Sequence, residues 1–154
     1  RGDNATDRLR RAMEARAQDS TVLLDTTRII ILPMNLNDDR LGQTENMYDR
    51  LRDEVTDIIH AAWKMDFNMT IKDFDRECLQ GLYQLLRLAS SASIQFPMRF
   101  HFISSISSAG CGLLSEIQEE PLPRRVEIAL AQGYGQSKYA EEHMCWAAMD
   151  LCCE

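Results

Sequence analysis

The sequence lacks the features that place a protein in a membrane or on a nucleic acid. No apolar run approaches the roughly 20 residues of a membrane-spanning helix, and no basic segment followed by an apolar one marks a secretory signal. Positive charge is also in short supply, with 17 Lys and Arg against 24 Asp and Glu and a net charge of −7. Such a surface repels phosphate backbones. We therefore expect a cytoplasmic protein that binds neither nucleic acid nor membrane, although a single nucleotide could still occupy a local pocket.

Cysteine is scarce and irregularly spaced. The five cysteines are Cys78, Cys111, Cys145, Cys152 and Cys153. An odd number with this spacing does not suggest a disulfide framework. His143 lies near the last three, but the paired, two-residue-spaced layout of structural zinc sites is absent. The sequence therefore predicts reduced thiols and no metal.

A glycine-rich phosphate-binding turn is missing as well. Dinucleotide-binding proteins carry this turn between their first strand and first helix, where backbone amides hold the pyrophosphate. The nearest candidates, around Gly110–Gly112 and Gly133–Gly135, have neither that position nor the third glycine. The chain therefore lacks one main source of dinucleotide affinity.

What the sequence does contain is an alternation of helix-like and strand-like segments. Apolar periodicity predicts helices over residues 6–17, 44–55, 71–92 and 135–151, with Thr44 capping the second. Short apolar runs predict strands at 28–32, 57–60 and 100–104, and residues 37–42 are expected to form a loop. Alternation of this kind indicates a doubly wound α/β fold, with a parallel sheet covered by helices on both sides. Ligands of such sheets bind at the carboxyl ends of the strands.

Tyr134 and Lys138 stand four residues apart at the start of the last predicted helix. Residues i and i+4 lie on one face of a helix, so both side chains point to the same side. A nearby ammonium lowers the pKa of a tyrosine from its ordinary value of about 10, which makes the phenol a better acid near neutral pH. The same spacing also arises by chance on exposed helices, so its context has to support the assignment.

That context is supplied by Ser104 and Ser105 at the end of the third predicted strand. A hydroxyl at the mouth of the sheet can donate a hydrogen bond to the carbonyl oxygen that Tyr134 would protonate. Serine at a strand end, followed by tyrosine and lysine at a helix start, is the acid constellation of short-chain dehydrogenases. The plainer interpretation of the serines is a polar turn.

Longer blocks extend the comparison. Residues 102–108 and 133–141 form one block, and residues 40–42, 48–49, 51–52, 58–63 and 66–68 form another. Both resemble the thioester reductase domain of fungal nonribosomal-peptide-synthetase-like, adenylate-forming reductases, which are extended short-chain dehydrogenases of the NAD(P)-binding Rossmann superfamily. The resemblance covers most of the chain, from about residue 8 to residue 142.

The resemblance implies NADPH-dependent reduction of an acyl thioester, held on the phosphopantetheine arm of a carrier domain, to an aldehyde or alcohol in secondary metabolism. Ser105 would polarise the carbonyl, Tyr134 would donate the proton, and Lys138 would make Tyr134 a better acid and hold the nicotinamide ribose. The cofactor would be bound by Asn35, Leu36, His60, Ala61, Ala62, Tyr134 and Lys138. Asn35 stands where the family usually has an aspartate that reaches the adenine. Without the resemblance, His60 would be interpreted as a histidine at a strand end whose hydrogen bonds are satisfied within the fold.

The chain also departs from the family. It reads as a fragment, residues 1–154, of a single NAD(P)-binding reductase domain that lacks the glycine-rich first strand–helix unit and the C-terminal substrate portion. We therefore expect the 154-residue chain alone not to reduce a thioester. Two alternatives remain open: an inactive truncated gene product, or a related extended short-chain reductase acting on a free acyl or sugar substrate.

Overall fold

The computed structural model describes residues 4–92 and 97–152. The chain divides into two compact units, Arg1–Met34 and Asn35–Glu154. All of the candidate site residues fall in the second unit.

The first unit contains the helix α1, Ala5–Glu14, and a 3-10 helix, Ser20–Leu24. Asn4 caps α1 by accepting a hydrogen bond from the Thr6 N–H, which satisfies one of the free donors at a helix start. The helix predicted over residues 6–17 is thus confirmed. It ends early, and Ala17 has a φ of 53°, in the left-handed region.

The strand predicted over residues 28–32 is not formed. The segment has irregular backbone, the Ile29 N–H bonds to the Asp25 carbonyl in a turn, and Ile30 is 61% exposed. A strand needs a neighbouring strand to accept and donate its backbone hydrogen bonds. Among the described residues the sheet consists of two strands, at residues 57–60 and 99–102, and these pair only with each other. An apolar run shows where a strand could form, but it does not supply the partner.

The second unit is built on two parallel strands, β1 (Asp57–His60) and β2 (Arg99–Phe102), with Ile58 opposite Phe100 and His60 opposite Phe102. Both predicted strands are confirmed, although β2 stops at Phe102. The connection is one long helical stretch, made of α3 (Ile71–Phe74), a π-helical segment (Asp75–Leu79) and α4 (Gln80–Ser90). Parallel strands require such a crossover, so the predicted helix over 71–92 and the α/β arrangement follow together.

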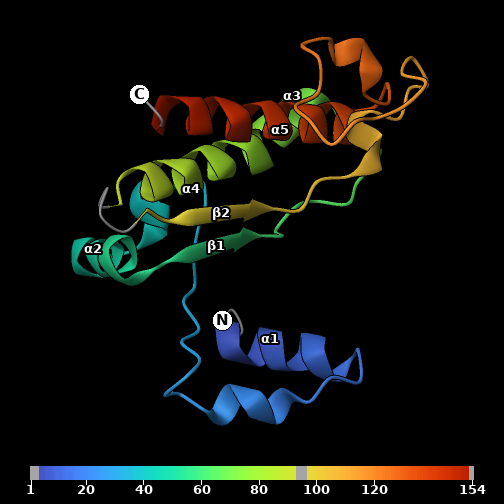
Figure 1. Ribbon diagram of the computed structural model, residues 1–154. Coiled ribbons are helices and arrows are strands. Elements are labelled where there is room, and N and C mark those ends of the chain that lie inside the picture. The colour runs from blue at the N-terminus through green and yellow to red at the C-terminus, as the bar shows by residue number, and fades with distance from the viewer. Residues whose placement is uncertain (1–3, 93–96, 153–154) are drawn as a thin grey trace. The chain divides into compact units, whose positions relative to one another are not determined.

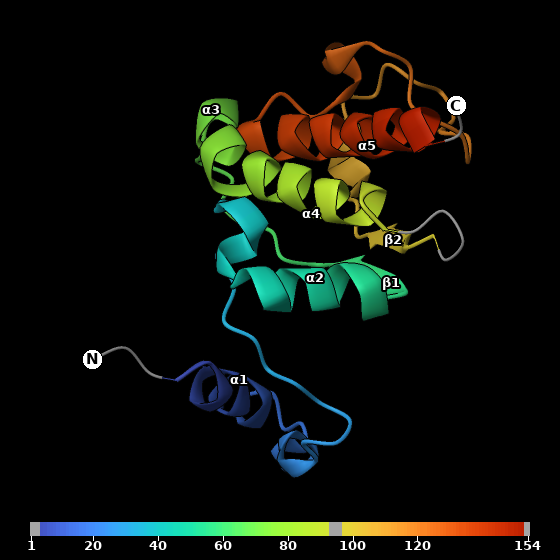
Figure 2. The ribbon, with the colours of Figure 1, turned by 90° about the vertical axis from the view of Figure 1, so that its left-hand side faces the viewer.

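Two further helices complete the second unit: α2 (Glu45–Glu54), capped by Thr44 as predicted, and α5 (Gly133–Cys152). Helices α4 and α5 run side by side near the two strands (Figures 1 and 2). Leu85 and Leu88 of α4 form a buried cluster with Leu41 and Met98, and Ile58 and Phe100 of the strands pack against it. On the other face of the strands, Ile59 is 72% exposed.

The turn that opens the second unit is shaped by Leu41. Arg40, Leu41 and Gly42 all have positive φ and belong to a 3-10 helix, Asp39–Gly42, inside the predicted loop. Left-handed backbone costs a residue with a side chain roughly 1–2 kcal/mol. Leu41 is fully buried, and burying a leucine side chain stabilises the fold by about 1.5–3 kcal/mol, which offsets this cost. The turn also places the Leu41 carbonyl to accept the Asn35 N–H, at 3.2 Å.

Replacing Thr70 with alanine should destabilise the second unit by about 1 kcal/mol. The Thr70 hydroxyl caps α3 and donates to the Asp73 carboxylate at 2.7 Å, and the same carboxylate accepts a hydrogen bond from the Thr70 N–H. Urea unfolding measures the loss. The exposed-loop substitution Ser115→Ala should change stability by less than about 0.5 kcal/mol. Equal effects of the two substitutions would show that the cap contributes nothing.

Candidate active site

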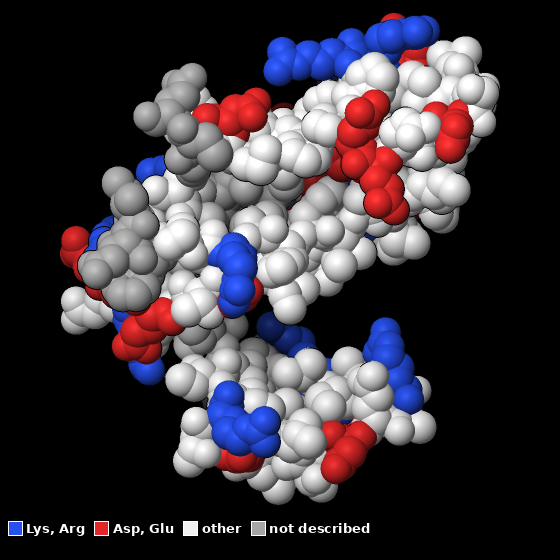
Figure 3. All heavy atoms as spheres, viewed as in Figure 1, with Lys and Arg blue, Asp and Glu red and all other residues white. Residues whose placement is uncertain are grey.

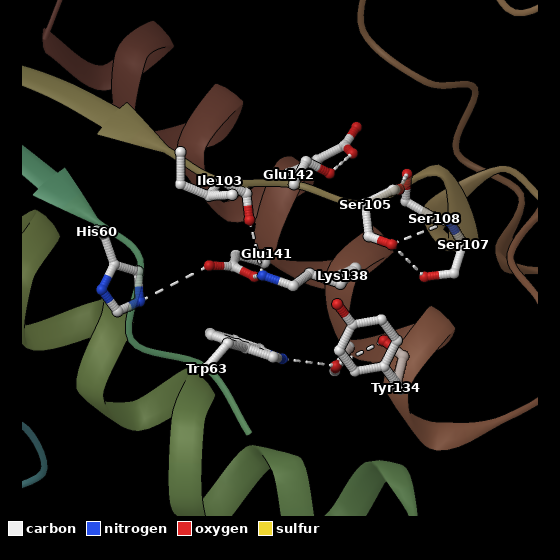
Figure 4. A network of polar contacts seen from close by, with 12 residues as sticks. His60, Trp63, Ile103, Ser105, Ser107, Ser108, Tyr134, Lys138, Glu141 and Glu142 are labelled. Carbon is white, nitrogen blue, oxygen red and sulfur yellow. Dashed lines mark hydrogen bonds and ion pairs between the residues drawn. The ribbon is translucent and has the colours of Figure 1, made fainter. Parts of the chain in front are cut away.

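The side chain of Lys138 lies in a buried cage between α5 and the ends of the strands (Figure 4). Its ammonium donates to the Ile103 carbonyl at 2.8 Å and to Glu141 Oε2 at 3.0 Å. The rings of Trp63 and Phe102 lie 4.4 and 4.8 Å from the same nitrogen, within the range of cation–π attraction. A lysine has three N–H donors, so one is left for another acceptor.

Tyr134 lies one helical turn before Lys138 and is buried. Its ring packs edge-on against Phe74 and Phe67, with centroids 6.1 and 5.2 Å away. In Figure 4 its hydroxyl points to the side of the cluster where Lys138 lies. The helical period of about 3.6 residues per turn thus brings the two predicted residues to one place, because both lie on the inward face of α5.

Trp63 fixes this arrangement from a different element. Its indole N–H donates to the Ser137 hydroxyl at 3.2 Å, and that hydroxyl donates to the Tyr134 carbonyl at 2.7 Å. Trp63 therefore ties the segment after β1 to the first turn of α5 while its ring contacts the Lys138 ammonium.

Ser105 lies three residues after β2 and caps the short 3-10 helix Ile106–Ser108. Its hydroxyl accepts from the Ser107 N–H at 3.2 Å and shares a 2.8 Å hydrogen bond with the Ser107 hydroxyl. The Ser104 hydroxyl instead donates to the Glu142 carboxylate. Figure 4 shows Ser105 beside Ser107 and Ser108, on the side of the cluster where Tyr134 and Lys138 lie.

An open pocket of about 630 Å³ lies beside the serines, and Ser105, Ile106, Leu122 and Trp146 are among its lining residues. Its rim is acidic, because Glu119, Glu120 and Glu142 also line it. Figure 3 shows acidic side chains gathered on this part of the second unit. A neutral, partly apolar ligand would suit such a pocket better than an anion.

Sequence reasoning missed Glu141, although it lies on the same face of α5 as Tyr134 and Lys138. It is fully buried, and its second oxygen lies 3.7 Å from His60 Nε2. Burial raises the pKa of Glu141 to about 8, although the Lys138 ammonium pulls it down. Burial, and secondly Lys138, lower the pKa of His60. His60 Nε2 is buried and has no hydrogen-bond partner among the described residues, so His60 is not the satisfied strand-end residue of the plainer interpretation.

Tyr134 and Lys138 thus share the inward face of α5, and Ser105 follows β2 by three residues. Comparisons with known proteins show the family of the chain. Residues 1–152 match the NAD-binding family described as Male sterility protein. The chain belongs to this family. It is 37% identical over 123 residues to adenylate-forming reductase Nps9 of Serpula lacrymans var. lacrymans, covering 79% of the chain and 11% of that relative.

Two further likenesses agree. The chain is 35% identical over 124 residues to the non-reducing polyketide synthase dbaI of Emericella nidulans, covering 76% of the chain and 5% of the synthase. It also superposes on the crystal structure of the terminal R domain from the myxalamid PKS-NRPS pathway, with a TM-score of 0.72 and 22% identity over 96% of this chain and 37% of that one. The predicted resemblance and the Rossmann-like α/β class are confirmed.

In this member of the Male sterility protein family, the remaining predicted cofactor residues lie in two places. Ala61 and Ala62 are exposed directly after β1, next to His60. Asn35 and Leu36 lie in the turn at the start of the second unit, and Leu36 packs against Gly81 of α4. Within the described residues, no hydrogen bond, ion pair or ring contact joins these two residues to Ser105, Tyr134 or Lys138. The described contacts therefore do not connect Asn35 and Leu36 with the predicted catalytic residues.

The part of the chain that the structure describes contains no group of three or more His, Cys, Asp or Glu side chains that could hold a metal. Cys153, one of the residues considered in the sequence, lies outside that part. In the same ranges, no helix combines the length and apolar character needed to cross a bilayer.

The raised pKa of Glu141 predicts that stability falls as the pH rises. A carboxyl that holds its proton more tightly when folded stabilises the fold fully below its unfolded pKa, and the contribution is lost as the pH passes the folded value. The free energy of unfolding should therefore fall between about pH 4.5 and pH 8. Denaturant unfolding at a series of pH values tests this. Glu141→Gln should flatten the slope in that window and Glu142→Gln should not, whereas equal slopes in all three proteins would refute the assignment.

Proposed function

We propose that the chain carries the catalytic residues for NADPH-dependent reduction of an acyl thioester bound to a carrier domain, releasing an aldehyde or an alcohol. The observation that carries the proposal is the buried Lys138 ammonium beside Tyr134, at the carboxyl ends of two parallel strands. Ligands bind there in α/β sheets. The relatives named as adenylate-forming reductases, and the R-domain fold, support the same chemistry.

The residues present fit the nicotinamide end of such a cofactor. Lys138 keeps one donor beyond those given to Ile103 and Glu141, and a ribose hydroxyl is an acceptor of suitable size. Ala61 and Ala62 offer an exposed, small-residue path after β1, along which the adenosine and pyrophosphate would lie. When bound, NADPH supplies the hydride.

Each catalytic residue has one role in this proposal. Ser105 donates a hydrogen bond to the carbonyl oxygen of the thioester, which stabilises the negative charge that grows there. Tyr134 gives its proton to that oxygen as the carbonyl carbon gains hydride, and Lys138 stabilises the phenolate that remains. The carbon–sulfur bond then breaks, the thiol leaves with a proton, and the carbonyl reforms as an aldehyde. A second hydride and proton would give the alcohol.

We further propose that residues 1–154 form the middle of a single reductase domain, with the phosphate-binding turn and the C-terminal substrate portion supplied by other sequence. The chain aligns with only 37% of the R-domain chain that it superposes on. A substrate in the pocket beside Ser105 would reach it as a neutral acyl group on a flexible arm, which suits the acidic rim.

In a reductase domain that contains this chain, Tyr134→Phe should lower turnover of an acyl-pantetheine thioester by about 10²-fold or more, since a positioned proton donor is lost. NADPH oxidation at 340 nm measures it, with NADH as the comparison cofactor. Tyr83→Phe, on the exposed face of α4, is the matched control and should retain full activity. Wild-type turnover in the Tyr134→Phe protein would remove this tyrosine from the mechanism.

A further inference from the structure

Two buried polar atoms next to Lys138 face one another without partners. Neither His60 Nε2 nor Glu141 Oε1 has a hydrogen-bond partner among the described residues. They lie 3.7 Å apart, with side chains 4% and 0% exposed. Roughly nine in ten buried polar atoms are hydrogen-bonded, so two orphans that point at each other indicate an interaction that a small approach would complete.

The other oxygen of the same carboxyl group connects this pair to the catalytic lysine. Glu141 Oε2 accepts from the Lys138 ammonium at 3.0 Å. Figure 4 shows His60, Glu141 and Lys138 as a row that leads from the end of β1 to the face of α5. Any change in the proton between His60 and Glu141 therefore alters the charge beside Lys138.

We propose that His60 and Glu141 share one proton across this gap, and that Glu141 is thereby the positioning residue for Lys138, whose own catalytic role rests on the proposed function. If the carboxyl group is protonated, it donates to His60 Nε2; if it is ionised, His60 Nε2–H donates to it. In either form, the carboxyl group stays fixed and holds the ammonium against the Ile103 carbonyl. With two of its N–H groups held by Ile103 and Glu141, the third N–H of Lys138 points in a fixed direction.

The charges around Glu141 favour this sharing. The titratable groups that face it are Lys138, Glu142 and Cys145 from α5, Cys78 from the π-helical segment, and His60 from β1. Lys138 is the one cation of this set, and Glu142 opposes a second negative charge. Burial disfavours an isolated ionised carboxyl and an isolated imidazolium here. One proton shared between the carboxylate and the neutral imidazole leaves the pair without net charge, which is the least costly arrangement.

The decisive experiment observes the lysine ammonium groups of the chain by ¹H–¹⁵N NMR, without cofactor. The chain has three lysines, of which Lys64 and Lys72 are exposed. We expect one slowly exchanging ammonium signal, from Lys138, and at least about tenfold faster exchange in Glu141→Gln, because the bond to a carboxyl group that shares a proton with His60 is replaced by a weaker bond to a neutral amide. Glu142→Gln removes the same charge from the next position and should leave the signal intact. An unchanged Lys138 signal in a folded Glu141→Gln protein would overturn the proposal.

A measurement on the unmodified chain covers the case in which Glu141→Gln does not fold. The ¹⁵N resonances of His60 should show Nε2 engaged with a hydrogen-bonded proton across neutral pH, as the 3.7 Å approach to Glu141 requires. A His60 imidazole that titrates like a solvent-exposed one would overturn the shared proton. Neither measurement needs cofactor or turnover, so a failure of the proposed reduction would leave both results unaffected.

Discussion

Replacing Phe74 with alanine is expected to destabilise the second unit by about 3–5 kcal/mol, the range for removing a buried aromatic ring. Phe74 is fully buried. Its ring stacks on Trp63 at 6.3 Å and meets Tyr134 edge-on at 6.1 Å. The substitution would therefore leave a cavity under both rings, and the surrounding helices can close it only in part.

Urea unfolding followed by tryptophan fluorescence measures the effect of Phe74→Ala. Phe67→Ala is the matched control, because Phe67 also contacts the Tyr134 ring but is 54% exposed. Most of its surface is already in water, so its loss should cost less than about 1.5 kcal/mol. A Phe74→Ala protein within 1 kcal/mol of the unmodified chain would show that the ring is not part of the stable core.

Much of this fold could be predicted because it depends on local sequence. The bounds of β1 and the Thr44 cap follow from apolar runs and capping residues a few positions apart. The failed strand at residues 28–32 had an equally good local pattern, but pairing depends on a second strand that the pattern does not contain. The π-helical segment at Asp75–Leu79 likewise leaves no mark in the periodicity.

The candidate site divides in the same way. Tyr134 and Lys138 could be paired from their spacing, because one helix carries both. Three other contacts of the site could not be predicted, because each joins segments that are distant in the sequence. They are the bond from Lys138 to the Ile103 carbonyl, the Trp63 ring against Lys138, and the His60–Glu141 contact. Glu141 did carry a signal, as it follows Lys138 by three residues on one helix face. That signal is shared by every solvated ion pair on a helix, and only burial distinguishes it.

Gly133→Ala should cost more than about 3 kcal/mol, at or beyond the usual upper limit for overpacking. A Cβ at this position would lie 2.1 Å from the Met69 carbonyl oxygen and 2.7 Å from the Thr70 carbonyl carbon. Both are backbone atoms beside the start of α3, so no side chain can rotate away, and the first turn of α5 must shift together with Tyr134. Gly112→Ala is the matched control: its Cβ would meet nothing within 4 Å, and its φ of +80° should cost only roughly 1–2 kcal/mol. If thermal unfolding shows the two variants equally destabilised, close contact between α5 and α3 does not limit this position. If Gly133→Ala alone unfolds early, the small residue before Tyr134 is required for α5 to pack against the start of α3.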